Sequence, residues 1–472
     1  ALDVLKYDWV GSVYRSHRAE GDAGLLCVLP TALLIRSTSR ENSAQRLSKY
    51  GLKEVVEKSK FLGPYQYFTI AKPKEKDALE IRDELLAREK ALVRDVRFET
   101  IPMIVPTAMV PNDTHFPRQW NMTQVQAGGP GQTGWDISTG AAAVVICVLD
   151  EGCDLTHPDL QFSGPGINLG SMTPPGTPTG NHGTACAGIA AATINNGGEG
   201  VAGMAGACRV LPAAFDAWSD VEVAAGINFA TAAGARVISM SFGWNAWDPN
   251  IIDPAIQNAF DNNVAMCVAT HNHNGAITYP ATNPLVMAVG ASDQADDRKS
   301  PASPDGECWG SNFGPQISVV APGVRVPTTD VQGNNGYNNN GGGAMNWACV
   351  NYAVTGDAAG DYIFIFDGTS AATPHVAGLA ALLISYDNSL THVAVREIIE
   401  ETADKVGTTA YAITPGRPNG TWNQNMGYGR INVRRALRRL SKHWWKEIKD
   451  AVDKPVYAEH KPVWSEVAKR HW

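Results

Sequence analysis

Three residue types that together could catalyse acyl transfer stand next to apolar segments of this chain. Asp150 ends the apolar run 144–149, and His182 opens an alanine-rich segment. Ser370 precedes the run 376–384, which is apolar nearly all round and predicts a buried helix. Free N–H groups and the positive dipole at a helix start favour a nucleophile whose intermediate is an oxyanion. A serine there is also a common N-cap, and this segment alone does not choose between the two roles.

Ser241 and Asn272 extend this set, because each follows an apolar run that predicts a strand. Parallel sheets gather functional groups at the carboxyl ends of their strands, so we expect these side chains near Asp150. Taken singly, an aspartate at a strand end is often a cap, and a histidine at a helix start is often a surface group. The chain order Asp150, His182, Ser370 makes a chance grouping hard to accept.

The elements that must position these residues alternate along the chain. Near-continuous apolar runs are typical of strands buried on both faces of a parallel sheet. Such runs lie at 144–149, 210–213, 237–240, 264–269 and 286–290, with helical segments at 182–193 and 220–233. The alternation predicts an α/β domain with a doubly wound, mainly parallel sheet flanked by helices.

The preceding part of the chain has a different composition, with more charge. Its expected elements are strands at 31–36, 55–60, 65–71 and 93–105 and helices at 42–50 and 74–90. The order βαββαβ predicts a small α+β, ferredoxin-like domain over residues 31–106. Such a unit could be an independent domain of any function.

Composition excludes several classes of function. The chain of 472 residues has a net charge of −8 and no basic stripe, which argues against nucleic-acid binding. We find no apolar run long enough to span a membrane. The chain starts at Ala1 without an evident signal peptide, so a leader could have been removed or the sequence trimmed.

The cysteines and the remaining segments give weaker indications. Eight cysteines include no CxxC pair, which argues against zinc, and Cys147, Cys186 and Cys267 lie in apolar segments that predict buried free thiols. We expect an N-terminal extension at 1–30, a long Asn/Gly-rich surface insertion with a possible hairpin at 324–366, and a basic, aromatic tail at 441–472.

Four segments carry a resemblance to a known family. They are Asp150-Glu151-Gly152 with His157-Pro158-Asp159, Asn181-His182-Gly183-Thr184, Thr270-His271-Asn272, and Gly368-Thr369-Ser370. In this order they resemble the subtilase family of serine endopeptidases, with the thermitase-like branch as the nearest match. The resemblance covers about 31–440. It implies a subtilisin-like catalytic domain at 107–440 and a propeptide at 31–106 that acts as folding chaperone and inhibitor.

The resemblance also implies a role for each site residue. Ser370 attacks the scissile carbonyl, His182 acts as base and then acid, and Asp150 holds the imidazole and stabilises its cation. Asn272 and the Ser370 N–H are the expected oxyanion donors. The segment Ser241-Phe242-Gly243 is expected to pair with the substrate backbone and to wall the S1 pocket, which takes the P1 side chain before the scissile bond.

The chain departs from the family at the pocket. His271 stands where members usually carry glycine, His273 follows, and Thr278 is expected at the pocket floor. One hypothesis is a medium-sized S1 pocket that tolerates acidic P1 residues, more so at low pH. The alternative is that both imidazoles point to solvent.

Calcium is the cofactor that the resemblance implies. The expected ligands are Asp113, Asp159 and Asn196, because carboxylate and amide oxygens suit Ca²⁺. The loop 193–200 is one residue longer than usual, so Asn195 could take the place of Asn196. A solvated Asn-Gly turn is the alternative.

The function expected from these features is a secreted, monomeric endopeptidase made as a zymogen and cut between Ile104 and Val110. Its partners are peptide substrates and its own propeptide, with no nucleic acid or membrane span. Two alternatives stay open: a peptide ligase or macrocyclase with 324–366 as a lid, and a non-enzymatic binding relative. An α/β-hydrolase esterase is disfavoured because Ser370 is not in GxSxG.

Overall fold

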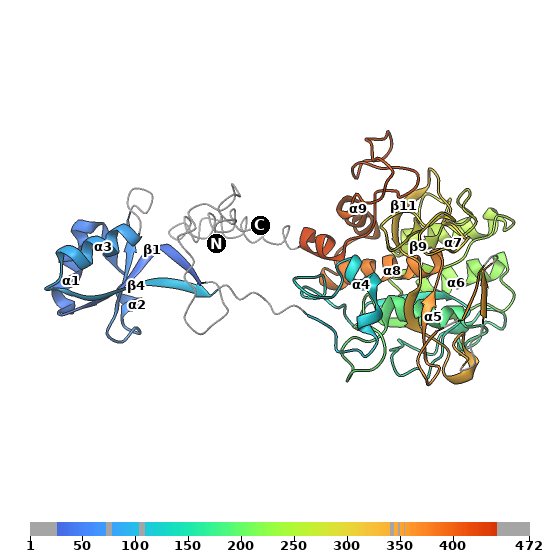
Figure 1. Ribbon diagram of the computed structural model, residues 1–472, viewed down its shortest axis with the longest axis horizontal. Coiled ribbons are helices and arrows are strands. Elements are labelled where there is room, and N and C mark those ends of the chain that lie inside the picture. The colour runs from blue at the N-terminus through green and yellow to red at the C-terminus, as the bar shows by residue number, and fades with distance from the viewer. Residues whose placement is uncertain are drawn as a thin grey trace. The chain divides into compact units, whose positions relative to one another are not determined.

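The computed structural model describes residues 26–71, 78–102, 109–339, 344–347, 350–353 and 355–440. They form two compact units, one before and one after residues 103–108 in the chain (Figure 1). The described residues do not include the N-terminal extension up to residue 25 or the tail from 441. They also leave out the expected cut site, except for Met109 and Val110, which begin the second unit. In the described part, no helix is long and apolar enough to cross a membrane.

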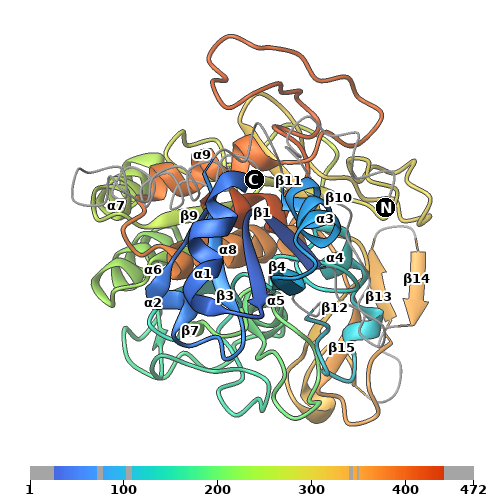
Figure 2. The ribbon, with the colours of Figure 1, turned by 90° about the vertical axis from the view of Figure 1, so that its left-hand side faces the viewer.

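The smaller unit is an antiparallel sheet covered by helices. The sheet has the order β2-β3-β1-β4. The strands are β1 (Leu26–Ser37), β2 (Leu52–Glu54), β3 (Gln66–Ile70) and β4 (Val93–Pro102). Helices α1 (Arg40–Leu47) and α3 (Ala78–Arg88) pack on it, with η2 (Ser48–Tyr50) after α1 (Figure 2). Alternate residues Leu33 and Ile35 of β1 share a face and form one core with Leu47 and Leu85 of the two helices.

The strand expected at 55–60 is wrong. Residues Val56–Ser59 form the short helix α2, and the strand before it is the three-residue β2. Glu57 and Lys58 favour a helix over an edge strand, and only Ser59 of the four helix residues is buried. Ser59 Oγ donates to the Val55 carbonyl and accepts the Tyr67 N–H, so it fixes the helix against β3.

The larger unit contains a seven-stranded parallel sheet, which confirms the predicted fold class. Its order is β11-β10-β9-β8-β5-β7-β6. The strands are β5 (Val145–Asp150), β6 (Ile167–Asn168), β7 (Arg209–Ala214), β8 (Val237–Met240), β9 (Ala265–Ala269), β10 (Met287–Ser292) and β11 (Ile317–Pro322). Strands β8 to β11 are buried at every position, as expected of strands covered on both faces.

Helices connect and cover these strands (Figure 1). They are η3 (Phe116–Arg118), α4 (Trp120–Gln124), α5 (His182–Ala191), α6 (Asp220–Ala232), α7 (Pro249–Asp261), α8 (Thr369–Tyr386) and α9 (His392–Thr402). Helix α8 is buried from Thr369 to Ile384 and contacts α5 and strands β8 to β11. A Cβ on Gly378 would come within 2.5 Å of Met204 Cβ, so only glycine allows this close packing.

The insertion at 324–366 is not a surface loop at its base. Strand β12 (Val326–Thr329) pairs antiparallel with β15 (Tyr362–Phe366), and both lie largely buried. Thr328 and Thr329 donate to the carbonyls of Ala185 and Thr184 in α5, at 2.7 Å each. Farther out, η4 (Gly333–Asn335) precedes the hairpin of β13 (Ala344–Trp347) and β14 (Val350–Ala353). The two threonine hydroxyls donate hydrogen bonds to carbonyls of α5. Because their polar atoms are paired in this way, this polar segment can be buried.

The cysteines follow the prediction where the structure describes them. Cys147, Cys186 and Cys267 are buried and free, as are Cys153 and Cys208. Cys308 is disulfide-bonded.

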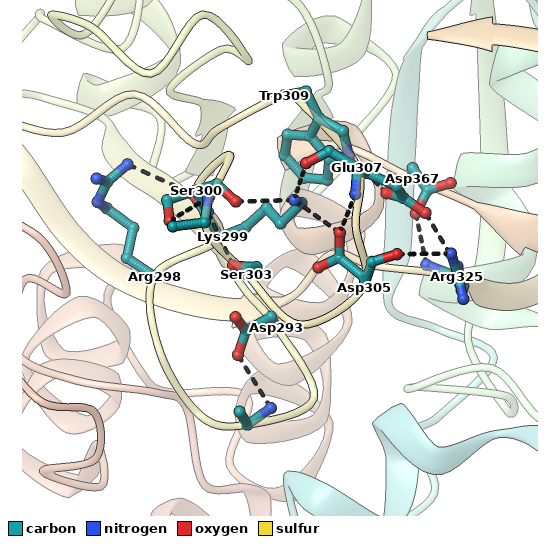
Figure 3. Close-up of polar contacts among 12 residues, drawn as sticks. Asp293, Arg298, Lys299, Ser300, Ser303, Asp305, Glu307, Trp309, Arg325 and Asp367 are labelled. Atoms are coloured by element: carbon teal, nitrogen blue, oxygen red, sulfur yellow. Dashed lines mark hydrogen bonds and ion pairs between the residues drawn. The ribbon is translucent and has the colours of Figure 1, made fainter. Parts of the chain in front are cut away.

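A group of charged residues, buried except for the partly exposed Arg325, supports the segment before Ser370. We call Lys299, Asp305, Glu307, Trp309 and Arg325 the Lys299 cluster (Figure 3). Lys299 is fully buried, and its Nζ lies 2.8 Å from Asp305 Oδ1 and donates to two backbone carbonyls. The buried Glu307 carboxylate accepts from Arg325 Nε at 3.0 Å and from Trp309 Nε1 at 2.8 Å.

The Lys299 cluster reaches the active-site turn through Arg325. The Arg325 N–H donates to Asp367 Oδ1 at 2.5 Å, three residues before Ser370. The cluster therefore holds the strand-to-helix turn that carries the serine.

Candidate active site

The predicted residues meet at the carboxyl ends of β5, β8 and β9. Asp150 is the last residue of β5, Ser241 follows β8, and Asn272 follows β9. His182 and Ser370 lie in the first turns of α5 and α8. The parallel order of the sheet places these ends side by side, which is the arrangement expected from the sequence.

Asp150 and His182 form a close pair. His182 Nδ1 lies 2.8 Å from Asp150 Oδ1 and 3.0 Å from Oδ2. The carboxylate is buried, whereas the imidazole is 22% exposed. Burial disfavours a charged imidazole, but the charge and hydrogen bond of Asp150 outweigh it and raise the pKa of His182 well above its usual value. The Phe366 ring packs edge-on against His182 at 5.3 Å between centroids.

Ser370 is tied to the segment that follows β8. The Ser370 hydroxyl donates to the Ser241 carbonyl at 3.1 Å, and Ser241 Oγ donates to the Ser370 carbonyl at 3.0 Å. For His182 to accept this proton, the Ser370 hydroxyl would have to turn from the Ser241 carbonyl toward the imidazole. Catalytic hydrogen bonds often form fully only when substrate is bound.

Cys186 lies beside His182, as its position in the sequence predicts, and the structure adds its contact with Ser370. Its Sγ lies 3.7 Å from His182 Nδ1 and 3.6 Å from the Ser370 carbonyl oxygen. One turn of α5 separates Cys186 from His182, and that spacing was the available sequence signal. Burial raises the pKa of the Cys186 thiol, so it is a neutral packing group here.

The Asn272 side chain is held in one orientation. Its Oδ1 accepts from the Thr369 N–H and from Thr369 Oγ1, both at 2.9 Å, which leaves Nδ2 to face the other way. A Cβ built on Gly368 would lie 3.1 Å from Asn272 Nδ2 and 3.4 Å from the Ser370 nitrogen. Asn272 Nδ2 and the Ser370 N–H therefore border one small space. Gly368, whose φ is 112°, leaves this space open because it has no side chain.

His271 adopts a backbone conformation that favours glycine. Its φ is 83°, which explains why a residue without Cβ is usual at this position. The His271 N–H donates to Thr369 Oγ1, and its Nδ1 accepts the Asn272 N–H at 3.0 Å. The His273 ring stacks on it at 4.5 Å. Burial, and then the neighbouring His273, lower the pKa of His271, so it stays neutral near pH 7.

These residues open onto a cleft of about 570 Å³. Its walls are Glu151, His182, Trp218, Ser241, Phe242, Gly243, Trp244, Trp247, His271 and Tyr337. His271 therefore faces the cleft and not only solvent. Thr278 is not one of these residues: it is buried behind Gly243, where a Cβ on the glycine would lie 2.4 Å from Thr278 Oγ1.

The sequence did not identify five of the residues that line the cleft as site residues, namely Glu151, Trp218, Trp244, Trp247 and Tyr337. Trp218 packs against Phe242 at 5.7 Å, and Phe242 in turn packs against Trp247 at 5.6 Å. Three tryptophans within thirty positions of Ser241 were the usable signal. Tyr337 could not be found this way, because it comes from the insertion.

The predicted calcium ligands also come together. Asp159 Oδ1 accepts from Asn196 Nδ2 at 2.8 Å, and Oδ2 accepts the Val201 N–H at 2.9 Å. Asp113 accepts the Asn195 N–H at 3.0 Å. Both carboxyl groups are buried, and burial raises their pKa values, that of Asp159 to about 7 with a further contribution from the Asp113 charge.

The oxygen atoms of this loop fit a hard cation. Asn196 Oδ1 and Thr193 Oγ1 are buried without a hydrogen-bond partner among the described residues. Asn195 Oδ1, by contrast, accepts the Asn112 N–H at 2.9 Å. Asn196 is thus the residue whose amide oxygen is unused, and two buried carboxylates beside it match the donor set that Ca²⁺ prefers.

Comparisons with known proteins identify the family of this chain. The family model described as "Subtilase family" matches residues 141–429. The chain is 34% identical over 319 residues to "Thermitase" of Thermoactinomyces vulgaris, covering 66% of this chain and 97% of that protein. It is also 34% identical over 324 residues to "Thermophilic serine proteinase" of Bacillus sp. (strain AK1), covering 66% and 68%.

A further relative and a solved structure add detail. "Calcium-dependent protease" of Trichormus variabilis is 30% identical over 364 residues, covering 68% of this chain and 51% of that protein. A solved protease structure from Pseudoalteromonas arctica has a TM-score of 0.53 at 25% identity and covers 70% of this chain and 99% of that one.

Proposed function

This chain belongs to the subtilase family and is a subtilisin-like serine protease, and we propose that it hydrolyses peptide bonds through an acyl-enzyme on Ser370. The observation that carries the proposal is the approach of Asp150, His182, Ser370 and Asn272 at one edge of the sheet. No described feature favours ligation over hydrolysis.

In the first half of the reaction, His182 removes the proton of the Ser370 hydroxyl as Oγ attacks the scissile carbonyl carbon. Asp150 keeps the proton on His182 Nδ1 and stabilises the imidazolium. Asn272 Nδ2 and the Ser370 N–H donate to the oxyanion. The protonated His182 then gives its proton to the leaving amine, and the acyl-enzyme remains.

In the second half, water takes the place of the amine. His182 removes a proton from that water, which attacks the acyl carbonyl, and the same two donors stabilise the second oxyanion. Collapse returns the proton to Ser370 Oγ and releases the acid. His182 must be neutral to start either half, so its raised pKa implies an alkaline working range.

Calcium is part of the proposal as a structural ion. Asp113, Asp159 and Asn196 would hold it, and it would supply the positive charge that the two buried carboxylates lack. Two relatives are named calcium-dependent proteases.

We also propose that residues 31–106 are a propeptide that inhibits the enzyme until it is cut off. Their separate compact core supports an independent unit. The disulfide at Cys308 supports action in an oxidising compartment outside the cell, where we propose that the enzyme works as a monomer.

Covalent labelling tests the central claim. We expect a fluorophosphonate to label wild type on Ser370 and to leave the Ser370→Ala variant unlabelled. Peptide hydrolysis should fall by about 10⁶-fold in that variant, as when the serine of a triad is removed. Mass spectrometry of the two proteins should show a cut between residues 104 and 110 only when Ser370 is present. Labelling elsewhere, or equal hydrolysis in both proteins, would contradict the proposal.

A further inference from the structure

The described side chains that line the cleft include a negative charge and no lysine or arginine to balance it. Glu151 is the only carboxylate on its walls, and no lysine or arginine is present among the described residues that line it. The two imidazoles carry little compensating charge on their own, because His182 is paired with Asp150 and His271 has a lowered pKa. Electrostatics therefore favour a positively charged group in this cleft.

The Glu151 carboxylate has a fixed position beside the catalytic base. It follows Asp150 at the end of β5, and its Oε2 accepts the His182 N–H at 3.1 Å. A Cβ on Gly180 would lie 2.1 Å from that oxygen, so glycine there leaves room for the carboxylate. Glu151 takes part in no ion pair of the described chain, and the half-buried side chain keeps its charge available to a ligand.

The direction of an extended substrate decides which of its residues meets Glu151. Successive side chains of a strand point to opposite faces. If the P1 side chain points to the wall made by Phe242, Gly243 and His271, the preceding side chain, P2, points toward His182 and Glu151. Tyr337 also lines this cleft, and its ring lies 6.2 Å from Phe366, which itself packs on His182.

We infer that Glu151 makes this protease select substrates with lysine or arginine at P2. This rests on the proposed function and adds a substrate class to it. The P2 ammonium or guanidinium group pairs with the Glu151 carboxylate, while the methylene stem contacts Tyr337.

Cleavage of matched peptides by the full-length protein tests this inference. The peptides differ only at P2, which is lysine, norleucine or glutamate. We expect kcat/KM to be about fivefold higher for lysine than for norleucine, since a partly exposed ion pair contributes about 1 kcal/mol. Glutamate at P2 should be the poorest substrate, and added salt should reduce the lysine preference.

Two substitutions show whether Glu151 is responsible. In Glu151→Gln the lysine-to-norleucine ratio should fall to about one, and this ratio cancels any general loss of activity. In Glu151→Lys the preference should invert toward glutamate. The exposed Glu397 of α9 provides a matched control, and Glu397→Gln should leave the ratio unchanged.

The outcomes separate this inference from the proposed function. Cleavage of all three peptides at equal rates, or an unchanged ratio in Glu151→Gln, overturns the P2 assignment and leaves the protease intact. If no peptide is cut and Ser370 is not labelled by a fluorophosphonate, the proposed function fails and the inference fails with it.

Discussion

The Lys299 cluster and the catalytic cleft both hold charged groups beside aromatic rings, but they differ in how fully these groups are paired. The three donors of Lys299 Nζ meet Asp305 and two carbonyls, and both oxygens of Glu307 accept a hydrogen bond. Asp305 Oδ2 is the exception, since it is buried without a hydrogen-bond partner among the described residues. In the cleft, Asn272 Nδ2 and Glu151 Oε1 have no hydrogen-bond partner within the described residues. A fully paired group stabilises one conformation, whereas an unpaired one can bind a ligand or a transition state.

The loop that we propose to bind calcium lies between these extremes. Like the Lys299 cluster it buries carboxylates, and like the cleft it lacks a partner for some of its oxygens within the described chain. The difference is that, among the residues that the structure describes, no side-chain cation reaches Asp113 or Asp159. A metal ion can balance the charge of these two carboxylates, as Lys299 balances the charge of Asp305 in its cluster.

The largest effect should come from removing the buried cation. We expect Lys299→Met to lower the free energy of unfolding by about 3–5 kcal/mol, because Asp305 is left buried without its partner. Denaturant unfolding in a Ser370→Ala background avoids self-digestion. The turnover of correctly folded enzyme, counted by active-site titration, should change little.

The exposed Arg209 at the start of β7 offers a control. Arg209→Met should change stability by less than about 0.5 kcal/mol. A Lys299→Met protein as stable as wild type would show that the pairing of Lys299 with Asp305 contributes nothing, and the comparison with the cleft would fail.

The next effect concerns the unpaired amide of the cleft. Asn272→Ala should lower kcat by about 10²–10³-fold, because one oxyanion donor is lost. KM and the unfolding free energy should change much less. Steady-state kinetics beside thermal unfolding checks this, with the exposed Asn334→Ala as control. A loss of stability as large as that of Lys299→Met would instead make Asn272 a structural residue.

Calcium removal should have a smaller effect that depends on pH. Excess EGTA should reduce stability by about 2–3 kcal/mol relative to calcium at about 100 times its Kd. Without calcium, burial raises the pKa of Asp159 to about 7, above the value of about 3.9 in an unfolded chain. The folded state then binds more protons than the unfolded state, so stability falls as pH rises from about 4 to about 7.

Melting temperatures measured across this pH range, in EGTA and in calcium, test both parts. Calcium should abolish most of the decrease in melting temperature that we expect as pH rises from about 4 to about 7. Identical curves in the two buffers would mean that the loop binds no calcium.

The smallest effect concerns the pH at which kcat/KM falls on the acid side of the pH profile, which is its acid limb. Asp150 raises the pKa of His182, and only the neutral imidazole can act as base, so kcat/KM should rise with pH and level off well above about pH 6.5. A pH profile with a substrate that does not ionise in this range measures the limb. A midpoint at or below about 6.5 would show that the Asp150 charge does not dominate at His182.

The sequence by itself determined the fold class, the family and the candidates for chemistry. Long apolar runs, each followed by a polar residue, predicted both the parallel strands and the ends at which Asp150 and Asn272 stand. The short β2 and α2 were misassigned because a strand of three residues has too few positions to show a period.

Only the tertiary structure decided which residues share a surface. It showed that Asn196, and not Asn195, has an unused oxygen, that Thr278 lies behind Gly243, and that Glu151 lines the cleft. It also showed that the base of the insertion is buried on α5. Local patterns record how each residue sits in its own element, whereas these contacts join elements far apart in the chain and depend on how the elements pack.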